Sequence, residues 1–267
     1  MASKFDSEIN EKRFARPSSD ARLLQRRRRL RERLGVNIYI LPNLLTTGNM
    51  FCGFFAIVYS IRNEFIIAAY AIVAAAVFDM LDGRVARMTN TESPFGAEYD
   101  SLSDIVSFGM APALLLYLWA LEPFGRLGWL ASFGYLACAA LRLARFNVQA
   151  SSEKNYFQGL PTPMAAGIVA SAVLCFNDLQ IDAYRSHILL VIAFGLAIVM
   201  VSNFRYRSFK DIDFRKKQPF TYLVIGVLVF ILIALRPEVM LFALFLIYAS
   251  LGAIFGLFFY KRKEMDL

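Results

Sequence analysis

Residues 79–104 read DMLDGRVARMTNTESPFGAEYDSLSD, and long apolar runs lie on both sides of this stretch. The run before it is IIAAYAIVAAAVF (66–78), and the run after it is IVSFGMAPALLLYLWAL (105–121). Each run is typical of a helix that enters a lipid bilayer. An ionisable side chain near the middle of such a helix costs about 2.5–3.5 kcal/mol on insertion scales, so the aspartates of this stretch indicate a functional site.

The spacing in the first half predicts a helix that gathers its polar and small residues on one face. Residues three or four positions apart are neighbours on a helix surface. Five residues of this half follow that rule: Asp79, Asp82, Gly83, Ala86 and Arg87.

The second half predicts another helix with an acidic stripe of its own. Gly96, Asp100 and Asp104 step by four and therefore lie on one face. Ser93 is a suitable N-cap and Pro94 suits the first helical position, so this helix is expected to begin there. Two antiparallel helices with facing acidic stripes form an oxygen-rich pocket, and hard cations such as Mg²⁺ or Mn²⁺ prefer such ligands.

The small residues of the stretch suggest what else the pocket binds. Gly83, Ala86 and Gly96 remove side-chain bulk beside the carboxylates, so that a large ligand can approach the backbone. Arg87 adds a planar cation suited to phosphate. Acids, an arginine and a cleared surface together favour a substrate that contains a diphosphate. For any one of these residues a structural role, such as helix packing or a snorkelling arginine, is an equally good interpretation.

The full pattern is Asp-x-x-Asp-Gly-x-x-Ala-Arg, eight residues, then Gly-x-x-x-Asp-x-x-x-Asp, and it resembles the signature of the CDP-alcohol phosphotransferases. Every motif position is filled in this chain. The resemblance implies an integral membrane enzyme that cleaves a CDP-linked lipid, transfers the phosphatidyl group to an alcohol and releases CMP. It also implies a homodimer. The motif residues that would contact the CDP moiety are Asp82, Gly83, Ala86, Arg87 and Gly96.

Charge balance predicts how many metal ions the pocket binds. Four ionised aspartates and a diphosphate carry about −6 together, which an apolar pocket does not tolerate without counter-charge. Two divalent ions and Arg87 supply +5, so we expect one ion at rest and two with nucleotide bound. The metal ligands are expected among Asp79, Asp82, Asp100 and Asp104.

The alcohol needs a base beside it, because a hydroxyl is a poor nucleophile at neutral pH. Asp104 is the last acid of its stripe, and the family resemblance implies that it is this base. The hydroxyl then attacks the lipid-side phosphorus directly. A covalent intermediate on Ser101, Ser103 or Ser107 is disfavoured, since none of these serines has a histidine or lysine nearby in the sequence to activate it.

Composition independently predicts an all-α, polytopic membrane helix bundle. Of the 267 residues, 58% are hydrophobic and 15% aromatic, and the mean hydropathy is +0.49. Hydropathy predicts about eight transmembrane helices, of which six would suffice as a catalytic core. The expected spans are 43–61, 65–87, 94–120, 127–146, 161–178, 186–203, 219–235 and 239–260.

The charges predict four regions and their orientation. The net charge is +8, and the cations cluster in the first 35 residues and at alternate ends of the spans. By the positive-inside rule both termini and the acidic pocket face the cytoplasm, as expected for the inner membrane of a bacterium. The regions are a basic cytoplasmic segment (1–35), a transmembrane catalytic domain (36–204), a basic cytoplasmic loop (205–218) and a C-terminal helix pair (219–267).

The basic N-terminal segment has two interpretations. Its arginine run, Arg26–Arg29, is compatible with nucleic-acid binding, but attraction to anionic lipid of the cytoplasmic leaflet fits a membrane protein better. We therefore expect membrane lipids rather than nucleic acid as its partner. Isolated cysteines and a single histidine, His187, leave no pattern for a zinc site or a disulfide framework.

Two softer motifs narrow the family resemblance. LPNLLTTGN (41–49) enters the first span, where Pro42 and Asn43 are expected at the helix entry. Gly48 and Gly53, inside the span, are expected to allow close helix packing. LRLARFN (141–147) carries Arg142 and Arg145. With FQGLPTP (157–163), these segments are similar to the family branch that uses CDP-diacylglycerol as donor and L-serine as acceptor. The two arginines either bind the acceptor carboxylate or a substrate phosphate, or are simply topogenic.

Two other functions remain open at the level of sequence. Within the family, the acceptor could be glycerol phosphate or inositol phosphate, and Arg142 with Arg145 does not exclude a phosphorylated acceptor. From another class, an ion-coupled transporter could bind its cation with intramembrane acids. Transporters of that kind usually contain inverted repeats, and the acidic motif has no second copy in this chain.

Overall fold

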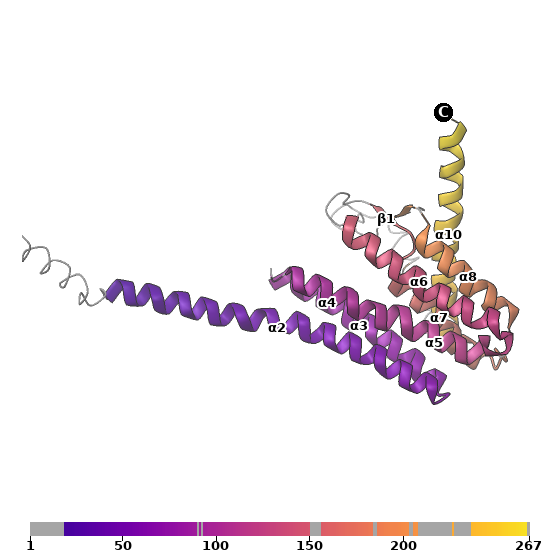
Figure 1. Ribbon diagram of the computed structural model, residues 1–267, viewed down its shortest axis with the longest axis horizontal. Helices are drawn as coiled ribbons and strands as arrows, with labels where there is room; N and C mark the ends of the chain where they lie inside the picture. The colour runs from indigo at the N-terminus through magenta and orange to yellow at the C-terminus, as the bar shows by residue number, and fades with distance from the viewer. Residues whose placement is uncertain are drawn as a thin grey trace, which may run out of the picture.

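The protein is described by a computed structural model that is almost entirely helical (Figure 1). It describes residues 19–89, 91, 93–149, 156–183, 186–202, 205–207, 226 and 236–265. The helices are α2 (Ser19–Ile61), α3 (Phe65–Thr89), α4 (Pro94–Asp104), η1 (Ile105–Met110), α5 (Ala111–Leu116), η2 (Tyr117–Leu121), η3 (Glu122–Phe124), α6 (Arg126–Gln149), α7 (Thr162–Asp178), α8 (His187–Val201) and α10 (Pro237–Met265), and the strands are β1 (Tyr156–Gln158) and β2 (Arg205–Arg207).

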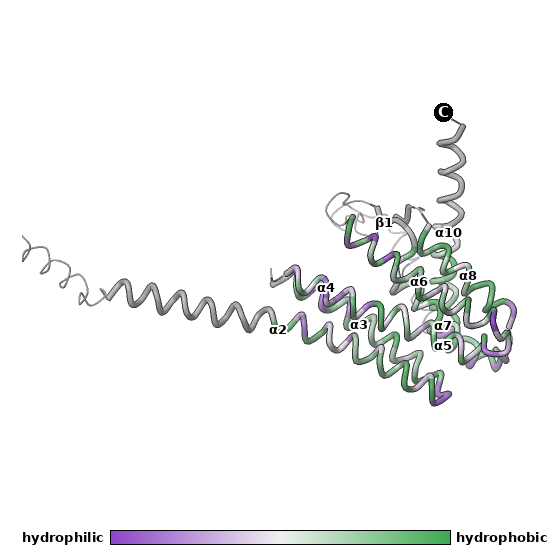
Figure 2. Tube along the Cα trace, in the orientation of Figure 1, coloured by the Kyte–Doolittle hydropathy of each residue, from purple (hydrophilic) through white to green (hydrophobic). Residues whose placement is uncertain are grey.

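The prediction of a polytopic membrane helix bundle is confirmed. Within the described residues, four helical segments are long and apolar enough to cross a membrane: Ile40–Ile61, Phe65–Thr89, Pro94–Phe124 and Arg126–Val148. Three shorter apolar segments follow: Thr162–Asp178, His187–Val201 and Pro237–Gly252. Most of the expected spans agree with these segments to within a few residues. The span 239–260 extends beyond Gly252 into the rest of α10, and 219–235 lies, apart from Gly226, outside the described residues. Figure 2 shows the apolar residues along the helices and hydrophilic ones at several of their turns.

One local expectation is wrong. The first apolar span is part of a much longer helix that begins at Ser19, so Pro42 lies inside α2 rather than at its entry. Proline lacks only one backbone donor, and a long helix tolerates that loss when its neighbours are in place. The all-α prediction is confirmed, and the bundle carries one small addition, a short antiparallel ribbon of β1 and β2 in which Phe157 pairs with Tyr206.

The helix that carries the second acidic stripe has the predicted start. Ser93 caps α4, and its hydroxyl accepts a hydrogen bond from the Gly96 amide at 3.0 Å. Beyond Asp104 the helix widens into the π-helical segment η1. Pro112 cannot donate to the Phe108 carbonyl, which accepts instead from the Tyr135 hydroxyl of α6 at 3.2 Å. A partner helix thus satisfies the carbonyl that the proline leaves without its usual donor.

Glycines allow α2 to approach both neighbouring helices closely. A Cβ atom on Gly53 would lie 2.4 Å from Ser107 Oγ and 2.6 Å from Ser107 Cα. A Cβ on Gly48 would lie 3.1 Å from the Phe78 ring of α3. The expectation that Gly48 and Gly53 permit close packing is therefore confirmed, for Gly48 against α3 and for Gly53 against η1.

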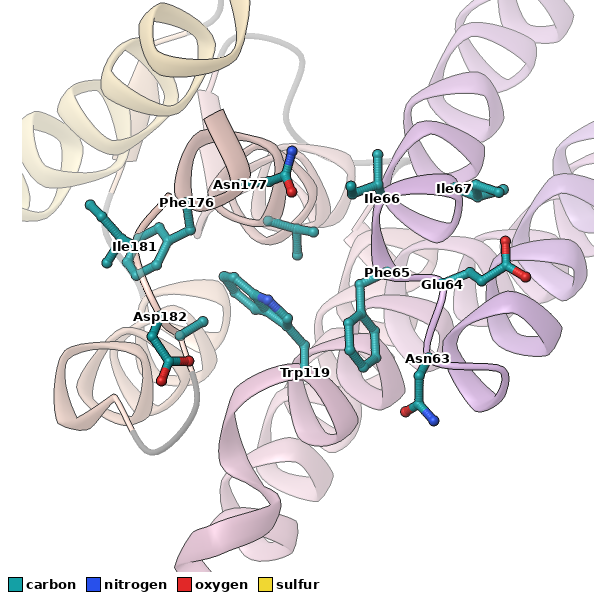
Figure 3. Close-up of a pocket in the computed structure, with 12 residues that line it drawn as sticks. Asn63, Glu64, Phe65, Ile66, Ile67, Trp119, Phe176, Asn177, Ile181 and Asp182 are labelled. Carbon is teal, nitrogen blue, oxygen red and sulfur yellow. The ribbon is translucent and has the colours of Figure 1, made fainter. Parts of the chain in front are cut away.

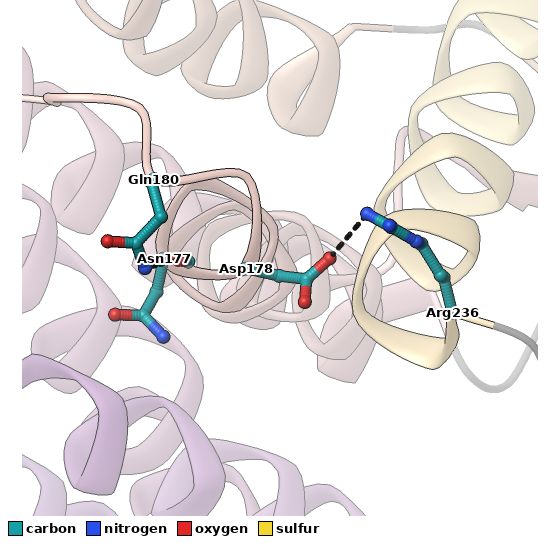
Figure 4. A network of polar contacts seen from close by, with 4 residues as sticks. All are labelled: Asn177, Asp178, Gln180 and Arg236. Carbon is teal, nitrogen blue, oxygen red and sulfur yellow. Dashed lines mark hydrogen bonds and ion pairs between the residues drawn. The ribbon is translucent and has the colours of Figure 1, made fainter.

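Helix α10 packs along α7 in the antiparallel sense, as two contacts show. Arg236, just before α10, forms an ion pair with Asp178 at the end of α7, with 3.3 Å between Nη1 and Oδ2 (Figure 4). One side of Gly167, near the middle of α7, is covered by the Phe245 ring, which would lie 3.0 Å from an added Cβ. The ion pair is exposed and contributes little by itself, so the apolar contact holds the two helices together.

We expect Gly53→Ala to destabilise the bundle by about 1–3 kcal/mol, because the added methyl group would overlap the backbone of η1. The measurement is the thermal unfolding midpoint of the purified protein in detergent. Gly134→Ala is the matched control, since a Cβ at Gly134 meets nothing within 4 Å. A midpoint for Gly53→Ala equal to that of the control would contradict the close approach of α2 to η1.

Candidate active site

The two halves of the acidic motif meet at one end of the bundle, as their spacing predicts. Asp79 and Asp82 come from α3 and Asp100 comes from α4. One carboxylate oxygen from each of the three lies within 4.8 Å of the other two. Asp104 lies one helical turn beyond Asp100, close enough for its charge to interact with those of Asp79 and Asp100.

Helix α2 supplies two hydrogen-bond donors to this cluster. The Thr46 hydroxyl lies 2.9 Å from Asp82 Oδ2, and the Asn49 side-chain amide lies 3.2 Å from Asp104 Oδ1. Asn49 has no exposed surface and Thr46 only 4%. Buried donors of this kind stabilise the ionised form of a carboxylate and fix its orientation.

The spacing of residues in the sequence does not predict a role for Thr46 or Asn49. A signal was present, because polar side chains three residues apart within an apolar span face the same side of a helix. That signal does not say which neighbour they face. The structure identifies it through two more bonds, in which Ser103 Oγ donates to the Thr46 carbonyl and Ser107 Oγ donates to the Asn49 carbonyl.

The small motif residues lie around the cluster in different surroundings. A Cβ on Gly83 would find only the Arg87 guanidinium within 4 Å, at 3.9 Å, so the surface there is open. Arg87 is exposed and turns back toward this surface. Gly96 is more confined, since a Cβ there would lie 3.1 Å from Ser93 Oγ and 3.5 Å from Asn43 Oδ1. Ala86 is partly buried one turn after Gly83.

Arg142 on α6 is connected to the acidic cluster by its charge. It is 7% exposed, and its charge interacts with that of Asp104. Its Nη1 donates to Thr162 Oγ1 at 3.3 Å, while its buried Nε has no acceptor within the described part of the chain. Arg145, one turn further along α6, is half-buried and has contacts of its own.

The donor set fits a hard divalent cation. Oxygen atoms from Asp79, Asp82 and Asp100 converge, and among the described residues the buried Oδ1 of Asp100 has no hydrogen-bond partner. Carboxylate oxygens are the ligands that Mg²⁺ and Mn²⁺ prefer. The cluster is thus compatible with the divalent metal expected from the sequence.

A separate pocket of about 650 Å³ lies near the other end of α3 (Figure 3). Phe65, Trp119 and Phe176 line it together with Glu64 and Asp182. Asp79 is 14 residues beyond Phe65, which corresponds to about 21 Å along a helix. This pocket is therefore too remote to form part of the acidic cluster.

Fold and site together define an integral membrane protein with a cation-compatible carboxylate centre inside its helix bundle. The sequence profile of the CDP-alcohol phosphatidyltransferases matches residues 39–201. The chain belongs to this family. That match covers α2 from its apolar part through α8, and so includes every aspartate of the cluster.

Curated relatives agree with this assignment. A CDP-diacylglycerol–serine O-phosphatidyltransferase of Helicobacter pylori (strain J99) is 39% identical over 85% of this chain and 98% of its own length. The enzyme of the same name from Bacillus subtilis (strain 168) is 34% identical over 64% of this chain and 91% of its own length. An archaetidylserine synthase of Methanothermobacter thermautotrophicus is 37% identical over 62% of this chain and 69% of its own length.

We expect Asp100→Asn to weaken Mn²⁺ binding by at least about tenfold, because the change removes a charged ligand from a cluster of three. Mn²⁺ binding is measured by electron paramagnetic resonance on the purified protein without substrate. Asp178→Asn is the control, since Asp178 is an acid at the far end of α7 paired with Arg236. Equal Mn²⁺ affinity of Asp100→Asn and the control would remove Asp100 from the metal site.

Proposed function

We propose that this protein transfers the phosphatidyl group of CDP-diacylglycerol to the hydroxyl of L-serine, giving phosphatidylserine and CMP. The observation that carries the proposal is the convergence of three motif aspartates inside a CDP-alcohol phosphatidyltransferase fold. The acceptor follows from the relatives, whose names specify different lipids but have serine in common.

The donor side of the site binds the CDP-linked lipid. Asp79, Asp82 and Asp100, with Asp104 at the edge, would hold Mg²⁺ or Mn²⁺, with two ions when nucleotide is present. The bound metal would supply positive charge against the diphosphate and the departing CMP. The open surface at Gly83 and Ala86 receives the nucleotide and Arg87 contacts its phosphates, while Gly96 lets α4 begin close beside α2.

Asp104 is the base in this proposal. Its Oδ1 accepts the Asn49 amide, which leaves Oδ2 to take the proton of the serine hydroxyl. The serine oxygen then bonds to the lipid-side phosphorus as the bond from that phosphorus to CMP breaks. The side chain that positions the base thus belongs to α2, whereas the base itself belongs to α4.

The structure also bears on the alternative of a covalent enzyme intermediate. Ser103 and Ser107 donate their hydroxyl protons to carbonyls of α2, and both are fully buried. Ser101 bonds to the Ala97 carbonyl and to Asn147. Each hydroxyl is thus engaged in holding helices together, which supports direct attack by the acceptor.

The acceptor side of the proposed site centres on Arg142, which binds the serine carboxylate, with Arg145 nearby at the mouth. A guanidinium forms charge-assisted bonds to a carboxylate, and the buried Nε of Arg142 still lacks an acceptor. The same chemistry would suit a phosphorylated alcohol, so the acceptor has to be tested directly.

Two properties of the assembly belong to the same proposal. The site end of the bundle and both termini face the cytoplasm, with the basic segment 1–35 close to anionic lipid. The protein acts as a homodimer in the membrane of a bacterial cell. The boundaries 36–204 for the catalytic domain and 219–267 for the C-terminal pair complete the proposed organisation, although most of 205–218 and of 219–235 lies outside the described residues.

The decisive experiment is an alcohol screen with purified protein and CDP-diacylglycerol. We expect metal-dependent CMP release with L-serine, and neither glycerol phosphate nor inositol phosphate should replace it. A lipid product from glycerol phosphate but not from radiolabelled serine would show that the acceptor is wrong. If no condition gives CMP release, the ion-coupled transporter is favoured, because a transporter makes no CMP.

We expect Asp104→Asn to lower kcat by about 10²–10⁴-fold, because general base catalysis contributes that much. Asn49→Ala should lower kcat less, since it removes the partner of the base and leaves the base in place. Steady-state rates of CMP release measure both variants, and Asp178→Asn again serves as control. Wild-type turnover in Asp104→Asn would exclude Asp104 as the base.

A further inference from the structure

The C-terminal helix α10 lies outside the part of the chain that the family profile covers, which ends at residue 201. A six-helix core was expected to suffice for the chemistry, and no sequence motif assigned a role to this helix. Its contacts, however, follow α7 from the far end of the bundle toward the acceptor side of the proposed site.

Three positions set the course of α10 along α7. Arg236 pairs with Asp178 at the end of α7, and Phe245 covers Gly167 near its middle. One turn later Ala249 is buried, with 7% of its surface exposed. In an antiparallel pair, the next residues of α10 lie beside the first turn of α7, where Thr162 bonds to Arg142.

Tyr248 lies on the same face of α10 as Phe245 and Ala249, and it packs against the bundle core near this end of α7. It is partly buried, and its phenolic hydroxyl is close enough to the Arg142 guanidinium for the two groups to interact electrostatically. Arg142 thus has Asp104 and Tyr248 as polar neighbours in addition to its bond to Thr162. These three neighbours come from α4, α10 and α7.

A buried arginine that binds a small carboxylate needs neighbours that fix its orientation. The Arg142 side chain carries several rotatable bonds, and freezing them on ligand binding costs about 0.5–1.5 kcal/mol. Thr162 fixes one amino group. A second polar neighbour on the C-terminal helix would hold the guanidinium plane before the acceptor arrives.

We propose that Tyr248 is a positioning residue for Arg142, and that α10 thereby sets the affinity of the site for the acceptor carboxylate. The proposal rests on the proposed function, because it takes Arg142 as the group that binds serine. It assigns the C-terminal helix a part in acceptor recognition while the carboxylate centre that binds the CDP-linked donor stays on α3 and α4.

The test is Tyr248→Phe, which keeps the ring and removes only the hydroxyl group. We expect the KM for serine to rise roughly three- to tenfold, which is the range that ordering one flexible side chain before binding is worth. The KM for CDP-diacylglycerol and the thermal midpoint should stay within twofold and within a few degrees of the wild type. Tyr248→His, which restores a polar ring atom, should recover part of the serine affinity.

Tyr70→Phe is the matched control, because Tyr70 is an exposed tyrosine on α3, with 53% of its surface accessible. An unchanged serine KM in Tyr248→Phe would overturn the proposal. Equal increases in both KM values, or a lower thermal midpoint with no selective effect on serine, would also overturn it, because they indicate only a structural role. Absence of a serine product with the wild-type enzyme would instead refute the proposed function itself.

Discussion

Repulsion among aspartates held together inside an apolar bundle is the constraint on which this structure depends. Oxygen atoms of Asp79, Asp82 and Asp100 lie within 4.8 Å of one another. Two unit charges about 5 Å apart repel by about 3 kcal/mol at an effective dielectric constant of about 20. A bound cation would relieve this repulsion, and the acids also need neighbours that hold them in place. Thr46 and Asn49 of α2 are those neighbours.

The packing of α2 follows from that requirement. Donors on α2 reach the carboxylates only if the helix lies unusually close to α3 and η1. Gly48 and Gly53 remove the side chains that would prevent this approach, and Ser103 and Ser107 then bond to backbone carbonyls of α2. In lipid the hydrophobic effect does not drive helices together, so close packing at small residues and interhelical hydrogen bonds are the available means of association. The same contacts therefore stabilise the bundle and position the acids.

Much of this arrangement was predictable from sequence because it is local. Asp79 and Asp82 share a helix face by their spacing, Ser93 caps α4 as expected, and the short connection forces the two acidic stripes together. The length and apolarity of the spans follow from composition alone. These features depend on periodicity and capping, which act over a few residues.

What could not be predicted depends on contacts between distant segments. The pairing of Thr46 with Asp82 joins residues 36 apart, and that of Asn49 with Asp104 joins residues 55 apart. Periodicity shows that Thr46 and Asn49 share a helix face but not which helix that face meets. The interior position of Pro42 was not predicted because proline is favoured in the first turn of a helix and disfavoured further inside. In this chain the long helix α2 continues through it. The proposed donor side of the site thus lies in one continuous stretch of sequence, whereas the proposed acceptor side is assembled from α6, α7 and α10. On this proposal a change in α6 or α10 would alter which alcohol binds without disturbing the four aspartates, since none of the aspartates lies on those helices.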